Sequence, residues 1–142
     1  MARGVEEYAR RIAKEGPRTE LVVTVGWHLH NFYTALEDLF GRVAAELNAA
    51  PVQGPRSHAA LLQRMARPVP EVRPAVISRS TMLVLDELRR FRHVFRHAYT
   101  YVLQWEKMAP LAAALPELMA ALERDLTVFD RFLAGAVAAL EE

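Results

Sequence analysis

The chain has 142 residues, of which 52% are hydrophobic and 25% charged, and its formal net charge is +1. This composition excludes a disordered chain and predicts one globular domain over residues 1–142, while the absence of cysteine excludes disulfides, thiolate metal sites and a cysteine nucleophile. Because no apolar run approaches the ~20 residues that cross a bilayer and no signal peptide is visible, we expect a soluble, cytoplasmic protein without membrane contact.

Helical spacing of apolar residues recurs along the chain, and alternating strand patterns are nearly absent. The spacing predicts a helix over residues 5–15, which ends at Gly16-Pro17, and a long helix over 19–49. In the long helix, His30 and Glu37 are predicted to point away from the apolar stripe. A short helix over 57–65 follows, and His58 is interpreted as part of its capped start.

The proline-containing stretch 66–78 predicts an extended, semi-rigid connector. Ser78 or Ser80 then caps a helix that reaches about residue 102, and the last helix is expected from about Pro110 to residue 140. Together these elements predict an all-α fold, an up-and-down bundle of four to five antiparallel helices. The predicted core stripe of the helix that ends near 102 is Val84, Leu88, Phe91, Phe95, Ala98 and Val102.

Positive charge is concentrated in the middle of the chain. Arginines outnumber acidic residues between positions 56 and 96, whereas acidic residues outnumber basic ones after that point. Exposed arginines often do no more than solvate a helix face, but the dense cluster from 89 to 96 predicts a local anionic partner. Arg89, His93 and Arg96 are its candidate phosphate-binding residues.

Arg92 and His97 are the residues of this helix that suit the cleavage of RNA. Histidine carries protons near neutral pH, and the planar guanidinium of arginine matches phosphate oxygens. In such a reaction the ribose 2′-hydroxyl loses a proton and the leaving oxygen gains one. A regular helix places Arg92 and His97 about 140° apart. Either the helix distorts near His97, or a second copy completes the site across a two-fold axis.

Other chemistries find less support in the sequence. His93 and His97 have a spacing at which one helix face can hold a metal ion, but no third ligand is suitably placed, so we expect no metal and no cofactor. The six glycines form no phosphate-binding loop. Tyr99 shares an edge of the helix with Arg92, and it fits either a site residue or a core-edge tyrosine with a wet hydroxyl.

The segment from Arg92 to Tyr99 reads RHVFRHAY and contains the pattern Arg-x4-His-x-Tyr. It resembles the motif of HEPN-domain ribonucleases, specifically the HepT-like toxins. Residues 27–33 (WHLHNFY), residues 58–70 and residues 88–91 are also similar, so the likeness extends over roughly 21–133. The chain departs from many HEPN proteins at His93, where a small polar residue often follows the arginine.

The resemblance implies a homodimeric, metal-independent endoribonuclease toxin of a toxin–antitoxin pair, in which Arg92 and His97 of both chains line one cleft. It also implies a nucleotidyltransferase-type antitoxin that transfers AMP to the motif tyrosine, here Tyr99, and so blocks RNA phosphate beside Arg92. One alternative stays open: a non-catalytic helical module that binds a nucleotide or substrate and partners a nucleotidyltransferase. A plain oligomerisation bundle is the third interpretation.

Overall fold

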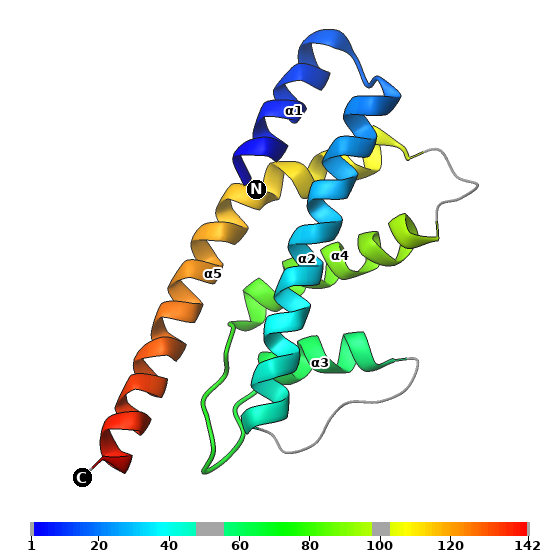
Figure 1. The fold of residues 1–142 in the computed structure, drawn as a ribbon. Helices are drawn as coiled ribbons and strands as arrows, with labels where there is room; N and C mark the ends of the chain where they lie inside the picture. Colours follow the sequence, from blue (N-terminus) through cyan, green and yellow to red (C-terminus); the bar gives the residue numbers. More distant parts are fainter. Residues whose placement is uncertain (1, 48–55, 98–102, 142) are drawn as a thin grey trace.

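The computed structural model describes residues 2–47, 56–97 and 103–141, and those parts contain five helices and no β-strand (Figure 1). The predicted all-α fold is therefore confirmed. None of the helices in the described parts combines the length and the apolar character that a membrane crossing requires. The helices are α1 (Ala2–Glu15), α2 (Thr19–Leu47), α3 (Ser57–Met65), α4 (Arg79–Arg96) and α5 (Trp105–Leu140).

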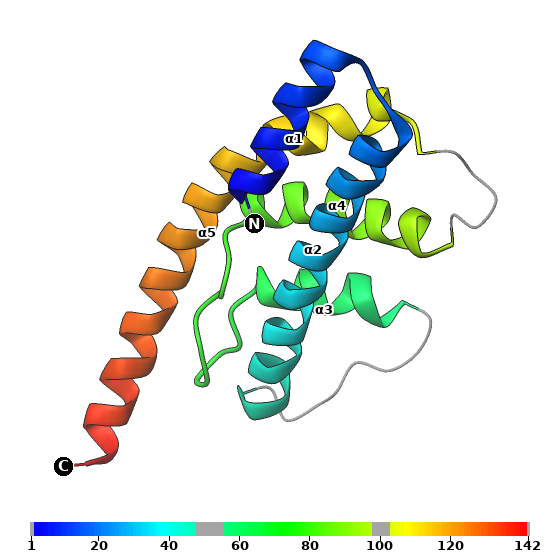
Figure 2. The ribbon, with the colours of Figure 1, turned by 45° about the horizontal axis from the view of Figure 1, so that its top comes forward.

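The long helix α2 is the centre of the bundle, because it contacts each of the other four helices. α1 folds back beside the first half of α2 and also contacts α5. α3 and α4 cross α2 at a clear inclination in both views (Figures 1 and 2). α4 therefore crosses the central helix, and its C-terminal end extends past α2 on the side away from the C-terminal part of α5 (Figure 1).

Short-range signals set several of the helix boundaries as predicted. α1 ends where Gly16 adopts a positive φ of 83° and its N–H donates to the carbonyl of Ile12 at 2.9 Å. α3 spans the predicted residues. Ser78 is the N-cap of α4, since its hydroxyl accepts a hydrogen bond from the backbone N–H of Thr81. Residues 98–102, the predicted last turn of that helix, lie outside the described part.

The predicted start of the last helix near Pro110 was wrong, because α5 begins at Trp105 and continues through Pro110 and Pro116. Each proline lacks the N–H that would donate within the helix, which weakens the ladder locally without ending it. The first turns of α5 run in a different direction from the rest of the helix (Figures 1 and 2). Prolines are a common cause of such a change of direction.

The connector between α3 and α4 was predicted to be extended, and this prediction was wrong. Val69 and Arg73 pair through two backbone hydrogen bonds, of 2.9 and 3.0 Å, and close a small turn. The guanidinium of Arg73 is buried, and its burial lowers the pKa of this side chain. It donates to the carbonyls of Arg64, Arg67 and Pro74. The turn thus satisfies carbonyls at the end of α3, which the helix leaves without partners.

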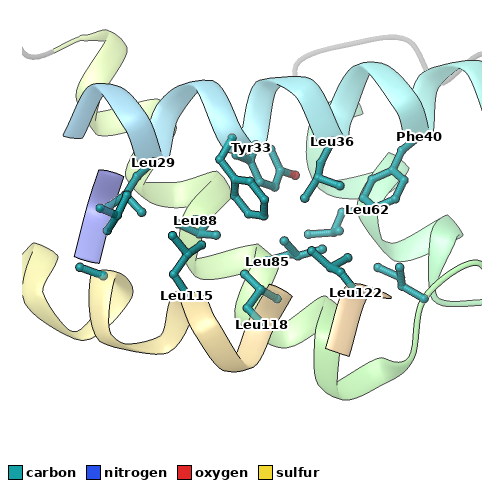
Figure 3. Packing of buried hydrophobic residues seen from close by; sticks show 14 of the residues in the cluster. Leu29, Tyr33, Leu36, Phe40, Leu62, Leu85, Leu88, Leu115, Leu118 and Leu122 are labelled. Atoms are coloured by element: carbon teal, nitrogen blue, oxygen red, sulfur yellow. The ribbon is translucent and has the colours of Figure 1, made fainter. Parts of the chain in front are cut away.

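The core lies between α2, α4 and α5, as Figure 3 shows. Side chains from the three helices interdigitate there, and Leu62 of α3 closes one end. The labelled members of this cluster are Leu29, Tyr33, Leu36 and Phe40 of α2, Leu85 and Leu88 of α4, and Leu115, Leu118 and Leu122 of α5.

The buried face of α4 differs from the predicted stripe. Val84, Phe91 and Phe95 are only partly buried, and Ala98 and Val102 lie outside the described residues. Leu88 is buried as predicted, and Val84 and Phe91 pack against the core from its edge, whereas the predicted stripe left out the buried Leu85 and Arg92. The residues of α4 that are buried are Thr81, Leu85, Leu88 and Arg92.

One carboxylate attaches the start of α4 to α5. Asp125 accepts hydrogen bonds from the backbone N–H of Ser78 at 2.8 Å and from the hydroxyl of Thr81 at 2.7 Å. Thr81 is buried, so the contact from its hydroxyl is partly shielded from competing water. The negative charge also lies at the positive end of the α4 dipole, which adds a favourable interaction.

We predict that Asp125→Ala lowers the free energy of unfolding by about 1–3 kcal/mol, because two donors at the start of α4 lose their acceptor. Asp130→Ala is the matched control on the same helix. Asp130 is exposed and has no hydrogen-bond partner among the described residues, so its replacement should change stability by less than about 0.5 kcal/mol. Urea denaturation followed by circular dichroism measures both changes. Equal stability of the two variants would contradict this role.

Candidate functional site

Arg92 is a buried arginine rather than a residue at the edge of a helix face. Its side chain is 6% exposed, and both of its terminal nitrogens contact the Glu37 carboxylate of α2. Nη1 lies 2.9 Å from Oε1, and Nη2 donates to Oε2 at 3.0 Å. This two-point pairing is the geometry in which a guanidinium binds a carboxylate most strongly. The prediction that Glu37 points away from the core was therefore wrong.

Two further side chains complete the surroundings of Arg92. The ring of Tyr33 lies under the guanidinium, with 5.0 Å between Cζ and the ring centroid, which is a cation–π contact. Burial, together with the nearby Glu37 carboxylate, raises the pKa of Tyr33 far above its ordinary value. Tyr33 therefore stays neutral, and Glu37 provides the charge that balances Arg92.

His58 of α3 joins the same group. Its Nδ1 lies 2.8 Å from Glu37 Oε1 and 3.3 Å from Arg92 Nη2. Because an ionised carboxylate only accepts, the shorter contact assigns the proton to Nδ1, which donates to Glu37. The longer contact with Arg92 Nη2, which only donates, is then not a hydrogen bond. The predicted helix start at Ser57 and His58 is confirmed, but the predicted capping role was wrong, because no side chain caps α3. His58 instead has an acidic partner, Glu37, which the sequence did not predict.

His97, the second residue of the motif, lies at the exposed C-terminal end of α4. It is the C-cap residue, and its Nδ1 donates to the carbonyl of His93 at 2.7 Å. The two imidazole rings stack with 4.4 Å between centroids. Since Nδ1 carries the proton that is donated, Nε2 of neutral His97 is left as a free proton acceptor. No contact joins His97 to Arg92 within the chain, although both residues are described.

The remaining predicted site residues differ in solvent exposure and in whether their charge is paired. Arg89 is partly buried, and its Nε donates to Asp86 at 2.8 Å, so its charge is already paired. His93 and Arg96 are exposed, and Arg96 makes no salt bridge to a described residue. Tyr99 lies outside the described residues. His93, Arg96 and His97 together form an exposed end of α4 in which Arg96 carries a fixed positive charge, and we call it the α4 end patch.

His30 of α2, which was predicted to point away from the core, is a partly buried neighbour of Arg92 and Arg96. Its Nδ1 is buried without a hydrogen-bond partner among the described residues, and its ring lies 5.3 Å from that of Phe95. Burial lowers the pKa of His30, and the charges of Arg92 and Arg96 lower it further. His30 is therefore kept neutral close to two positive charges.

A hollow of about 560 Å³ opens beside the Arg92 cluster, between the second half of α2 and the start of α3. Its described lining includes Glu37, Arg42, Ser57 and His58. This volume lies within the range of small-molecule sites, roughly 300–1,000 Å³. Among the residues that the structure describes, no group of three or more histidine, aspartate or glutamate side chains is placed to hold a metal ion.

Sequence reasoning missed Glu37, His58 and Tyr33 because all three reach Arg92 from distant parts of the chain. A usable signal did exist in α4. Leu85, Leu88 and Arg92 follow helical spacing, which places the arginine on the apolar stripe. A buried guanidinium requires an acidic partner, so this spacing predicts a carboxylate on the facing helix.

We predict that Glu37→Ala lowers the free energy of unfolding by about 3–5 kcal/mol, because it leaves the buried Arg92 charge unpaired. The double variant Glu37→Leu/Arg92→Met removes both charges and should recover most of that loss. Glu46→Ala is the control, since Glu46 is an exposed acid of the same helix. Chemical denaturation of the four proteins provides the comparison. A double variant no more stable than Glu37→Ala would show that charge pairing is not the cause.

Comparison with known proteins gives one match. A family model described as HepT-like protein matches residues 24–133, which is most of the chain and includes Glu37, His58, Arg92 and His97. Searches of curated proteins and of solved structures gave no match. The matched region includes the central helix from Thr24 onward and the whole Arg-x4-His-x-Tyr segment. The chain therefore belongs to the HepT-like family, which is of HEPN type.

Proposed function

We propose that the chain is a metal-independent endoribonuclease and the toxin of a toxin–antitoxin pair. The HepT-like family as a whole is associated with HEPN-type toxins and ribonucleases. The observation that carries the proposal is the state of His97. The motif histidine is exposed at the end of α4, with Nδ1 held by a carbonyl and Nε2 free to move a proton.

The proposed reaction is attack of a ribose 2′-hydroxyl on the adjacent phosphate. A neutral imidazole takes the hydroxyl proton, the bond from phosphorus to the 5′-oxygen breaks, and that oxygen gains a proton. His97 and Arg92 are the proposed catalytic residues, with Arg92 supplying positive charge near the phosphate. Arg89, His93 and Arg96 are proposed to contact the RNA backbone. DNA lacks the attacking hydroxyl and is not a substrate by this route.

The proposed assembly is a two-fold homodimer in the cytoplasm. Within one chain Arg92 faces α2 and α3, whereas His97 is exposed at the end of α4 and does not contact it. α4 ends at the C-cap His97, whose imidazole binds the carbonyl of His93. A second copy across a two-fold axis would unite both residue types in one cleft, and this is the arrangement that we propose.

One observation favours a second candidate function. Both terminal nitrogens of Arg92 are already bound to Glu37, so the guanidinium offers no open face to a phosphate in the single chain. A chain with this arrangement suits a non-catalytic helical module that binds a nucleotide or substrate through its hollow and partners a nucleotidyltransferase. Such a module would bind without cleaving, and the assay below separates the two functions.

We predict that the purified chain cleaves single-stranded RNA in the presence of a metal chelator and leaves the same sequence in DNA intact. His97→Ala should lower the cleavage rate by about 10²–10⁴-fold, because it removes a proton-transfer group. Arg131→Ala, an exposed change far along α5, is the control and should cleave at the wild-type rate. Gel analysis of a labelled oligonucleotide provides the readout. Equal cleavage by wild type and His97→Ala would point to a contaminating nuclease.

The proposed antitoxin is a nucleotidyltransferase that adds AMP to Tyr99. We predict that co-expression with such an enzyme raises the intact mass of the chain by one adenylate and abolishes RNA cleavage, because the adenylate adds bulk and negative charge that compete with RNA phosphate. Tyr99→Phe should show neither effect, whereas Tyr101→Phe, a neighbouring tyrosine of the same segment, should show both. Adenylylation that persists in Tyr99→Phe would place the modified residue elsewhere.

A further inference from the structure

The cluster around Arg92 contains a second imidazole that the Arg-x4-His pattern does not include. We propose that Glu37 and His58 form a carboxylate–imidazole dyad whose free Nε2 takes a proton from the RNA ribose in the hollow between α2 and α3. This inference rests on the proposed ribonuclease function and names a further catalytic residue for it, His58. Glu37 is then a positioning residue, which acts through His58, while Arg92 and His97 keep the roles proposed above.

The first support is the orientation of the ring. The Nδ1 proton of His58 is held by Glu37 Oε1 at 2.8 Å, so neutral His58 presents an unprotonated Nε2 on its other side. A carboxylate that holds one ring nitrogen fixes both the tautomer and the direction of the other, and this is how carboxylate–histidine pairs prepare a general base.

The second support is the rigidity of the carboxylate. Glu37 is bound at two points by Arg92, and the side chain of Arg92 is only 6% exposed and lies over the buried ring of Tyr33. The Glu37 side chain itself is 13% exposed. Because these groups are packed between α2 and α4, the acceptor for His58 cannot easily rotate away. This explains why a buried arginine stands next to a solvent-facing histidine.

The third support is access. The side chain of His58 is 52% exposed, although its Nδ1 is held by a mostly buried acid. Nε2 has no hydrogen-bond partner among the described residues, and the imidazole lines the hollow of about 560 Å³ together with Arg42 and Ser57. The cationic Arg42 and the hydroxyl of Ser57 are groups that can contact a phosphodiester. An ion pair that served stability alone would not need one ring nitrogen open to a hollow.

The proposed step balances as follows. Nε2 of neutral His58 takes the proton of the 2′-hydroxyl, and the resulting oxygen attacks phosphorus. The bond from phosphorus to the 5′-oxygen breaks, and that oxygen takes a proton from water or from a protonated histidine of the site. The products are a 2′,3′-cyclic phosphate and a 5′-hydroxyl, and no oxidant, reductant or metal ion enters the balance.

We test the dyad with His58→Ala, using a fluorescent single-stranded RNA oligonucleotide in chelator. We expect kcat to fall by about 10²–10⁴-fold, with KM changed less than threefold, because proton transfer is lost while RNA contacts remain. Added imidazole should restore part of the rate, since the open hollow admits a free base. Gln63→Ala, an exposed change on the same helix α3, should keep the wild-type rate and show no response to imidazole.

A second measurement does not depend on activity. Two-bond ¹H–¹⁵N spectra of the wild-type chain should show His58 protonated on Nδ1 and not on Nε2, and a spectrum with the proton on Nε2 would overturn the dyad. If wild type cleaves RNA and His97→Ala does not, but His58→Ala cleaves normally, the dyad fails while the proposed function stands. If wild type cleaves no RNA in chelator, the proposed function fails, and the proton transfer that rests on it fails too.

Glu37→Gln distinguishes positioning from obstruction. The amide keeps the shape of the side chain but loses the charge that holds His58 and Arg92. The dyad therefore predicts slower cleavage by Glu37→Gln. Imidazole should rescue His58→Ala equally well with and without Glu37→Gln, because a free base is not held by Glu37. Cleavage faster than wild type would instead show that Glu37 competes with phosphate for Arg92, and it would overturn the positioning role. Glu46→Gln, an exposed acid of the same helix, is the matched control.

Discussion

A positive charge buried between two helices needs a negative partner, and the pairing of Arg92 with Glu37 meets this requirement. The two residues are 55 positions apart, so their contact fixes how α4 lies against α2. The same carboxylate binds His58, which brings α3 into the arrangement. Apolar side chains can slide over one another at small cost, whereas a two-point ion pair permits one register. The pair therefore determines the geometry on which the neighbouring groups depend.

The candidate site consists of two separate imidazole groups that share one feature. In His97 and in His58 an acceptor holds Nδ1, a carbonyl in the first case and a carboxylate in the second. Each neutral ring therefore presents Nε2 as the proton acceptor. The surroundings differ, because the α4 end patch is cationic and open, whereas His58 stands beside a buried ion pair. A reaction that needs both a base and an acid can assign one role to each imidazole, because their environments differ.

Most of the fold follows from local signals in the sequence. Helical spacing, the Gly16 end of α1 and the Ser78 cap of α4 depend on neighbouring residues only, and they were predicted correctly. The turn at 66–78 could not be predicted, because it forms when buried Arg73 binds carbonyls of α3. The start of α5 was misplaced for a related reason, since tertiary packing outweighs the local effect of Pro110.

The sequence predicted Arg92 and His97 but not their partners, for one physical reason. A motif lies on one helix, whereas its chemistry depends on the helices that face it. Arg92 lies on the buried stripe of α4 with Leu85 and Leu88. Glu37 follows Tyr33 and precedes Phe40 at helical spacing, so it lies on the buried stripe of α2, while the adjacent Asp38 faces solvent. A stripe drawn through charged as well as apolar residues would place an arginine and an acid on facing helices. Burial makes their pairing necessary, and His58 then shares Oε1 of that acid with Arg92.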